Sequence, residues 1–216
     1  MGTYIQYGCG LWSPPGWINF DVSPTLRLQR LPLIGFFFKR GPTIFPEEVR
    51  FGDIVAGLPL PDDTADGIYA SHVLEHLCYD DFWIALRNTH RLLKPGGIFR
   101  LVVPDLEMRA RKYLSQLDNG IADSNTWFMD TSNLGTRRRG GAVALARSLF
   151  GNSAHLWMWD EKSIRAALER SGFVNVRRCH FNDCKDENFN LVEQVGRLHD
   201  APAGIDECAM EAQKPI

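Results

Sequence analysis

Several small and polar residues directly follow short apolar segments that are typical of buried β-strands. Gly8 and Gly10 flank Cys9 after the first such segment, and Asp21 and Asp53 follow the second and third. Glycines at such a point let the backbone approach a ligand closely. A carboxylate after the second strand can accept hydrogen bonds from both hydroxyls of a ribose, and one after the third can accept from an adenine amino group. We therefore predict an adenosine site formed by Gly8, Cys9, Gly10, Asp21, Asp53, Ile54, Ser71 and His72.

Four side chains near the same predicted strand ends could accept a proton from a substrate. They are His72, His76, Asp105 and His155. Histidine and carboxylate groups are the usual general bases of enzymes. No motif singles out one of the four, and each histidine could equally pack at a helix start or in a loop without a catalytic role.

Residues 72–76 (HVLEH) also match a pattern that is found in zinc peptidases. In a helix, His72 and His76 lie one turn apart on one face, as two zinc ligands would, and Glu75 could act as general base. Such peptidases need a third ligand from another helix, whereas this segment directly follows a buried-looking strand. We keep the peptidase as a minor alternative and predict no metal.

Alternating strand-like and helix-like segments predict an α/β fold with a mostly parallel sheet that is flanked by helices. The predicted strands are residues 4–7, 17–21, 48–51, 67–70, 98–103, 173–179 and 207–213. The clearest predicted helices are residues 82–93, which end at a turn over residues 94–97, and residues 160–171. Because ligands of open α/β sheets bind beyond the carboxyl ends of the strands, this fold would bring the site residues together.

Two segments break the alternation and are predicted as inserts, at about residues 23–46 and 106–159. The first holds a helix-like piece over residues 26–33, and the second begins with a helical pattern over residues 106–117. Inserts at strand ends often carry specificity. The first could form a lid, a homodimer contact or a peripheral membrane contact, or could simply pack. We expect residues 1–216 to form a single domain.

Motifs in a fixed order resemble those of the type 11 class I methyltransferases. Residues 7–10 (YGCG) and 16–21 (GWINFD) look like the first motifs. Later motifs are similar to residues 57–62 (GLPLPD), 66–77 (DGIYASHVLEHL), 92–97 (LLKPGG) and 170–173 (RSGF). The glycine motif alone would be weak, but the ordered set is specific.

The resemblance implies a Rossmann-like, seven-stranded sheet whose last strand is antiparallel, and S-adenosylmethionine as methyl donor. It also implies a methyltransferase that acts on a small molecule, or on a glycan or cell-envelope precursor in polysaccharide biosynthesis. The chain departs from the family pattern after the first strand, because only residues 11–16 separate Gly10 from Trp17. Six residues span at most about 20 Å, so the usual crossover helix cannot fit. The alternative is a non-catalytic binding or scaffold protein with a methyltransferase fold.

Composition narrows the partners and the compartment. The net charge is −2, so the chain has no overall field that would attract nucleic acid, and none is expected as a partner. The five cysteines are odd in number and irregular in spacing, and Cys179 and Cys184 lack a second pair that would complete a zinc site. The start of the chain does not read as a secretion signal. These features favour a cytoplasmic protein with reduced thiols.

Overall fold

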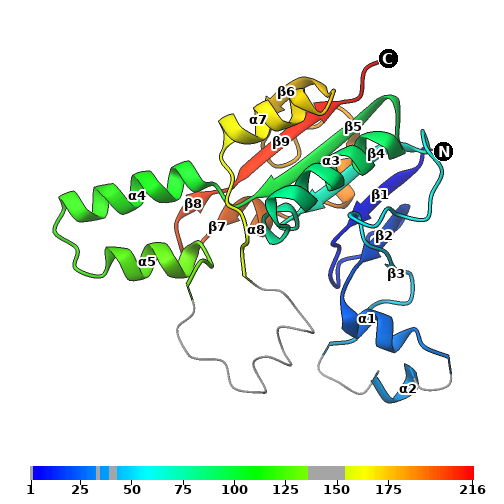
Figure 1. Ribbon diagram of the computed structural model, residues 1–216, viewed down its shortest axis with the longest axis horizontal. Coiled ribbons are helices and arrows are strands. Elements are labelled where there is room, and N and C mark those ends of the chain that lie inside the picture. Colours follow the sequence, from blue (N-terminus) through cyan, green and yellow to red (C-terminus); the bar gives the residue numbers. More distant parts are fainter. Residues whose placement is uncertain (1, 33–34, 39–42, 136–153) are drawn as a thin grey trace.

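A seven-stranded sheet forms the centre of the protein (Figure 1). The computed structural model describes residues 2–32, 35–38, 43–135 and 154–216. The strands are β1 (Tyr4–Tyr7), β2 (Trp17–Asp21), β3 (Arg50–Phe51), β4 (Ala65–Ser71), β5 (Leu93–Val103), β6 (Val174–Arg178) and β9 (Cys208–Gln213). They lie in the order β3-β2-β1-β4-β5-β9-β6. Strand β9 runs antiparallel to β5 and β6, while the other pairs are parallel, which confirms the predicted Rossmann-like sheet.

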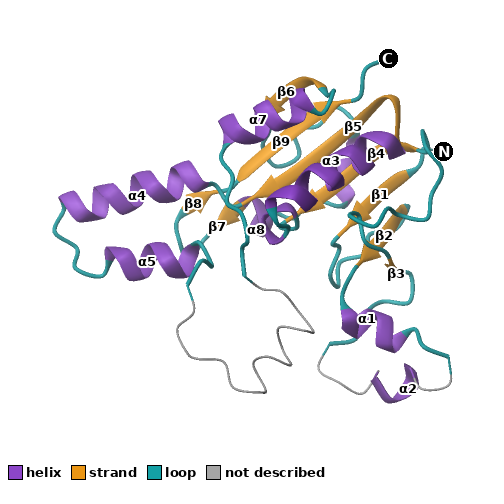
Figure 2. Cartoon of the chain, viewed as in Figure 1, coloured by secondary structure: helices purple, strands orange, loops and turns teal. Residues whose placement is uncertain are grey.

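Two helices cover one face of this sheet (Figure 2). Helix α3 (Tyr79–Leu92) buries Phe82, Ala85, Leu86, Thr89 and Leu92, which recur at helical spacing. Helix α7 (Glu161–Arg170) begins with a capping box between Asp160 and Ser163 and buries Ile164, Ala167 and Leu168. Both predicted helices are confirmed, with ends shifted by one to three residues.

The predicted strand ends needed small corrections. The third strand was predicted over residues 48–51 but pairs only over Arg50–Phe51. Residues 94–97 were predicted as a turn and instead belong to the first part of β5. That part is irregular, because the pairing with β4 shifts between Ala65 and Gly67 and Gly96 has a φ of 79°. Only glycine adopts such a φ without strain, so the signal that was read as a turn marks a bulged strand entry.

The opposite face of the sheet is covered by the β6–β9 connection, defined as residues 179–207. Residues 8–16 between β1 and β2 contain no helix, as their length predicts. The face that a crossover helix would cover is packed by Phe189, Val192 and Leu198, which lie against Trp17 and Tyr69 on the strands. The connection contains the 3₁₀-helix η2 (Glu187–Leu191), helix α8 (Val195–Leu198) and a hairpin of β7 (His199–Asp200) and β8 (Ile205–Asp206).

The described parts of both inserts contain helices. Helix α4 (Leu106–Asp118), predicted from its sequence pattern, pairs with α5 (Ser124–Thr131), and the two extend from one end of the sheet (Figure 1). The Leu106 N–H donates to the carbonyl oxygen of Trp159, so the second insert leaves and re-enters the sheet region at one point. The first insert contains α1 (Pro24–Gln29) and α2 (Gly35–Phe38); its remaining predicted features lie partly outside the described residues. Among the described helices, none has the length and apolar composition to cross a bilayer.

Candidate functional site

The turn after β1 needs its glycines. Gly8 has a φ of 66° and Gly10 a φ of 56°, a region that other residues rarely adopt. A Cβ on Gly8 would lie 2.2 Å from Val73 Cγ2, so a side chain there would displace the segment after β4. A Cβ on Gly10 would meet nothing within 4 Å. The turn is therefore packed against the protein at Gly8 and open on the side of Gly10.

Asp21 joins this turn to the end of β2. Its Oδ2 accepts a hydrogen bond from the Gly10 N–H at 2.8 Å, and its Oδ1 accepts one from the Ser23 N–H at 2.8 Å. Each carboxylate oxygen can accept a further hydrogen bond. The side chain is thus held in place and keeps acceptor capacity at the edge of the sheet.

Asp53 lies beside Asp21, after β3. Phe51 pairs with Asp21 in the sheet, and the Gly52 N–H donates to the Asp21 carbonyl oxygen at 3.1 Å. The Asp53 Oδ1 accepts from the Val55 N–H at 2.8 Å, while Ile54 is 4% exposed and packs into the core. The turn after β1, Asp21 and Asp53 therefore lie at one edge of the sheet; that they form an adenosine site stays a prediction.

Cys9 lies in the turn, and its side chain is buried. Burial and the nearby charge of Asp21 raise the pKa of the Cys9 thiol to about 12, so it stays protonated at neutral pH. Next to it is a hollow of about 330 Å³, lined by Cys9, Leu11, Trp12, Gln194 and Arg197. A small cavity of about 10 Å³ adjoins the ends of β1 and β4 and is bordered by Gln6, Tyr69, Ser71 and Arg197 among others.

Two polar groups from different parts of the chain face this region. The Gln6 Oε1 atom is buried and has no hydrogen-bond partner among the described residues. Arg197, from α8, borders both hollows and makes no ion pair within the described part of the chain. A buried acceptor without a donor is costly, and a guanidinium is the side chain best suited to a carboxylate or phosphate. Both groups fit a ligand that carries an ammonium and an anionic group.

His72 follows Ser71 in a strained conformation. Its φ is 54°, which is rare for a residue with a side chain and recurs at functional positions. Its Nε2 donates to the Arg197 carbonyl oxygen at 2.8 Å, and its Nδ1 lies 3.3 Å from Glu75 Oε1. Burial alone would lower the pKa of His72, but the contact with the Glu75 carboxylate outweighs it and raises the pKa.

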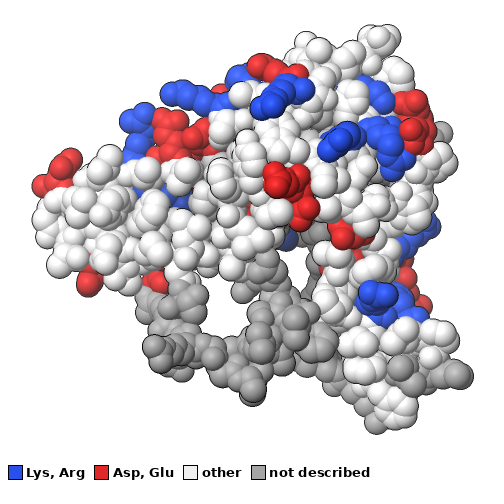
Figure 3. Space-filling view, viewed as in Figure 1, with Lys and Arg blue, Asp and Glu red and all other residues white. Residues whose placement is uncertain are grey.

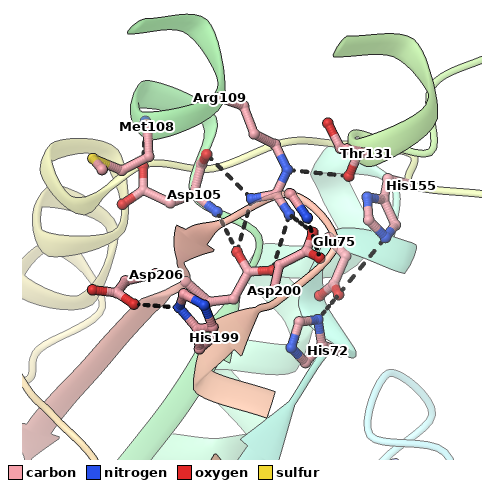
Figure 4. A network of polar contacts seen from close by, with 12 residues as sticks. His72, Glu75, Asp105, Met108, Arg109, Thr131, His155, His199, Asp200 and Asp206 are labelled. Atoms are coloured by element: carbon pink, nitrogen blue, oxygen red, sulfur yellow. Dashed lines mark hydrogen bonds and ion pairs between the residues drawn. The ribbon is translucent and has the colours of Figure 1, made fainter. Parts of the chain in front are cut away.

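Glu75 is the centre of a histidine cluster (Figure 4). Its side chain is fully buried, and neither carboxylate oxygen has a hydrogen-bond partner among the described residues. Besides His72, the Nε2 atoms of His76 and His155 lie 3.9 Å and 4.0 Å from Glu75 Oε1. The segment of His155 is held there because the N–H groups of Leu156 and Trp157 donate to the Glu75 carbonyl oxygen. Three of the four predicted proton acceptors therefore converge on one carboxylate.

Asp105 is placed differently from the three histidines. It is the N-cap of α4, where its Oδ1 accepts from the Met108 N–H at 3.1 Å, and its Oδ2 pairs with Arg178 at 3.1 Å. The side chain is 2% exposed. Both oxygens are committed to structure, so we do not carry Asp105 forward as a base.

A pocket of about 330 Å³ lies beside the histidine cluster. It is lined by His72, Pro104, Arg109, Thr131, Asn133, His155, Gly196, Arg197, His199, Asp200, Ala201, Pro202 and Glu207. Arg109 is buried at its wall, where it pairs with Glu207 at 2.8 Å and with Asp200 at 2.9 Å (Figure 4). Most of these lining residues have polar or charged side chains, so we call it the polar pocket. His72 and Arg197 place it next to the strand ends that carry the predicted adenosine site. Two larger hollows, near α3 with α7 and near β6 with β9, lie away from these strand ends.

Two residues of the site, Glu75 and Arg197, were not predicted from the sequence. Glu75 was considered only as the base of a peptidase, although its position between His72 and His76 was a usable signal. His72 and His76 do not share a regular helix as that alternative required, because only the 3₁₀-helix η1 (Leu74–His76) forms there. Arg197 had no signal, because the β6–β9 connection carries no recognisable motif.

A protein-family model covers most of the chain. Residues 17–178 match the family model described as a methyltransferase domain. No curated protein matches the chain in sequence. The matched segment is about three quarters of the chain and includes β2 through β6.

Solved structures share the fold at low sequence identity. A SAM-dependent methyltransferase from Thermotoga maritima is 17% identical, with a TM-score of 0.50 over 99% of this chain and 82% of its own. A 1,6-didemethyltoxoflavin-N1-methyltransferase from Burkholderia thailandensis is 18% identical, with a TM-score of 0.49 over 100% of this chain and 72% of its own. The structure described as PigF with SAH is 15% identical, with a TM-score of 0.47. That match covers 99% of this chain but only 50% of the PigF chain.

Proposed function

The chain belongs to the methyltransferase-domain family, and on that premise we propose that it transfers a methyl group from S-adenosylmethionine to a polar acceptor. The acceptor is a small molecule, or a glycan or cell-envelope precursor. One observation carries the proposal: the turn after β1, Asp21 and Asp53 meet at the same sheet edge, and a polar pocket lies beside them. The Thermotoga protein of the same fold is described as SAM-dependent, which supports the donor.

The residues at the sheet edge suit the parts of this donor. The open side of Gly10 and the spare acceptor capacity of Asp21 suit the ribose, and Asp53 suits the adenine amino group. Arg197 and Gln6 suit the carboxylate and the ammonium of the methionyl group. Together these side chains offer partners for each polar end of the donor.

When bound, S-adenosylmethionine supplies an electrophilic methyl group on a sulfonium, which leaves as a neutral thioether. The task of the protein is to align the acceptor with that methyl, which can contribute several kcal/mol. An acceptor hydroxyl or amine must also lose a proton. Of the predicted candidates, His72 and His155 line the polar pocket.

Charge in the polar pocket supports a hydrophilic acceptor. Arg197 borders both the pocket and the hollows near β1, so it can contact the donor or an anionic acceptor. On the face shown in Figure 3, acidic and basic side chains are interspersed, and this gives no support for a nucleic-acid partner. All five cysteines are free thiols, which is consistent with the proposed cytoplasmic location. A homodimer and the single-domain organisation of residues 1–216 remain predictions.

A non-catalytic binding protein is the alternative, and one contact favours it. The Trp12 indole N–H donates to the Val192 carbonyl oxygen at 3.1 Å, which narrows the space at the end of β1. Donor binding then requires this contact to open.

Calorimetry with S-adenosylmethionine and S-adenosylhomocysteine tests the proposal. We expect saturable binding of both, and release of S-adenosylhomocysteine when a panel of hydroxylated, phosphorylated and glycosylated acceptors is supplied. Binding without turnover on any acceptor would favour the non-catalytic alternative. The absence of any heat or thermal shift at millimolar ligand would reject the proposed donor site.

A further inference from the structure

The carboxylate of Glu75 has little compensation among the described residues. It is fully buried, and neither oxygen accepts a hydrogen bond within the described residues. A buried carboxylate without hydrogen bonds is destabilising, and proteins retain such groups when a partner or a metal ion completes them. His72 approaches to 3.3 Å but contacts only Oε1. The Glu75 Oε2 atom has no such contact, and the imidazoles of His76 and His155 lie close to the same carboxylate.

We propose that Glu75, His76 and His155 bind one divalent transition-metal ion beside the polar pocket. One ligand atom from each of the three lies within 4.8 Å of the other two. One carboxylate with two imidazoles is a common donor set for Zn²⁺ and for other first-row divalent ions. This inference does not depend on the proposed methyl transfer, because the ion would bind without donor or acceptor.

The distances fit a metal-free site that closes slightly around an ion. Bonds of about 2.0–2.1 Å at tetrahedral angles place ligand atoms about 3.4 Å apart. The His76 and His155 Nε2 atoms lie 3.9 Å and 4.0 Å from Glu75 Oε1. Each distance exceeds the spacing in a metal site by about half an ångström. Small rotations of the His76 and His155 side chains would close that difference.

The histidines already present the nitrogen that a metal needs. The His76 Nδ1 donates to the Ala154 carbonyl oxygen at 3.0 Å, which leaves Nε2, on the side of Glu75, as the nitrogen available to a metal. An imidazole fixed in this way by a backbone carbonyl is typical of metal-binding histidines. Among the described residues, the hydrogen-bond partner of the His155 Nε2 is the Asn133 side-chain amide, at 3.5 Å, which a metal would displace.

The ion would lie between the core and the polar pocket. Glu75 is fully buried, whereas His155 also lines the pocket and the His76 side chain is 27% exposed. A three-residue donor set leaves at least one coordination position free, as catalytic metal sites do. A water molecule or a substrate oxygen from the pocket would complete it. His72 contacts Glu75 and is assigned a positioning role, not a ligand role.

Metal binding to the full chain tests the proposal. Protein treated with EDTA and kept reduced is titrated with ZnCl₂ by calorimetry, and bound zinc is counted by mass spectrometry after dialysis. CoCl₂ gives a second readout, the visible d–d absorption that reports coordination geometry. We expect one Zn²⁺ per chain, and a thermal stabilisation by Zn²⁺ that EDTA reverses.

Matched variants show whether the cluster holds the ion. His76→Ala, His155→Ala and Glu75→Gln should each raise the dissociation constant for Zn²⁺ about 100-fold or more. His72→Gln should raise it less, about 10-fold, as is typical for a residue that only orients a ligand. His180→Ala removes an exposed histidine outside the cluster and should change nothing. Far-ultraviolet circular dichroism of each metal-free variant checks the fold, and a misfolded alanine variant is replaced by its glutamine counterpart.

Two results would overturn the metal site. One is less than a tenth of an equivalent of zinc on the wild-type chain at 100 µM ZnCl₂, which would leave Glu75 neutralised by His72 alone. The other is equal zinc binding by wild type, His76→Ala and His155→Ala, which would assign the zinc to other surface groups. The affinity for S-adenosylhomocysteine is measured on the same metal-free samples. If the wild type binds S-adenosylhomocysteine but no zinc, only the metal site is rejected. If it binds zinc but no S-adenosylhomocysteine, only the donor site is rejected.

Discussion

Asp21 is the residue through which the turn after β1 is fixed to the turn after β2. Because its charged oxygens keep acceptor capacity, we expect Asp21→Ala to weaken S-adenosylmethionine binding about 10–100-fold, the loss typical of hydrogen bonds to a charged group. Asp53→Ala should weaken S-adenosylmethionine binding less, by about 10-fold or below. Calorimetry measures both, with Asp118→Ala at the exposed end of α4 as the matched control. Equal losses in Asp21→Ala and Asp53→Ala would contradict the assignment of the ribose to Asp21.

Among the described residues, Arg197 is the one guanidinium that borders both the hollows near β1 and the polar pocket. If it holds the methionyl carboxylate, Arg197→Gln should weaken S-adenosylhomocysteine binding about 10-fold or more, because a charge-assisted pair is lost. Binding of 5′-methylthioadenosine, which lacks that carboxylate, should not change. Parallel titrations of the two ligands measure this difference. A similar loss for both ligands would instead mean that Arg197 shapes the hollow without pairing with the carboxylate.

The strand-end residues of the site could be predicted because their position depends on local signals. A glycine or aspartate that follows an apolar segment lies at the carboxyl end of a strand, and a parallel sheet brings such ends to one edge. Glu75 could not be recognised as a centre in the same way. Its burial and its missing hydrogen bonds are properties of the folded chain, in which His155 packs against it from a distant segment. Arg197 depends likewise on a connection whose path has no local signature.

At the scale of elements, the β6–β9 connection takes the place of a crossover helix. Phe189 is fully buried at its centre, with ring centroids 5.4 Å from Trp17 and 6.3 Å from Tyr4. We expect Phe189→Ala to lower the free energy of unfolding by about 3–5 kcal/mol, as for other large cavities in cores. Phe181→Ala, at a 42% exposed residue of the same connection, should change it by about 0.5 kcal/mol or less. Urea unfolding measures both, and similar small effects would mean that the connection does not pack as described.

The elements that could be predicted are those with a regular period. Strands β1, β2, β4 and β5 and helices α3 and α7 each show an apolar pattern over enough residues to be recognised. The 3₁₀-helix η2 and helix α8 are five and four residues long, and too short for a period. Helix α5 was missed as well, and among its eight residues only Ser124 is buried. The 3₁₀-helix η2 and helix α8 pack against the strands, and α5 packs against α4. A local pattern does not contain these contacts.

At the scale of the whole molecule, a buried guanidinium joins the sheet to the β6–β9 connection. Arg100 on β5 is 1% exposed and pairs with Asp183 at 3.0 Å, with Glu193 at 2.6 Å and with Glu211 of β9 at 2.6 Å. Arg177 of β6 completes the group by pairing with Asp183 and Glu211. Removal of one partner from such a network leaves a buried charge without compensation. The network therefore links three strands and the connection, and the loss of any one member should destabilise their packing.

This network should make the stability of the fold sensitive to acid. Burial alone would raise the pKa of Asp183, but hydrogen bonds from Arg177, the His180 N–H and Arg100 outweigh it and lower the pKa to about 2. A carboxylate with a lowered pKa in the folded state stabilises the fold above its unfolded pKa of about 4, and this contribution is lost as the pH falls towards 2. We expect about 2 kcal/mol at neutral pH, as a shift of nearly two pKa units implies.

Asp183→Asn isolates that contribution. Compared with wild type, its free energy of unfolding should be lower by about 2 kcal/mol at pH 7, and the difference should shrink between about pH 4 and pH 2. Urea unfolding across this range measures the difference, and Asp118→Asn serves as a control, because this exposed carboxylate should give no such pH-dependent gap. If the difference in free energy of unfolding between wild type and Asp183→Asn stays constant down to pH 2, Asp183 acts through packing and not through its charge. The connection would then be fixed to the sheet by its aromatic contacts, with Arg100 compensated by Glu193 and Glu211 alone.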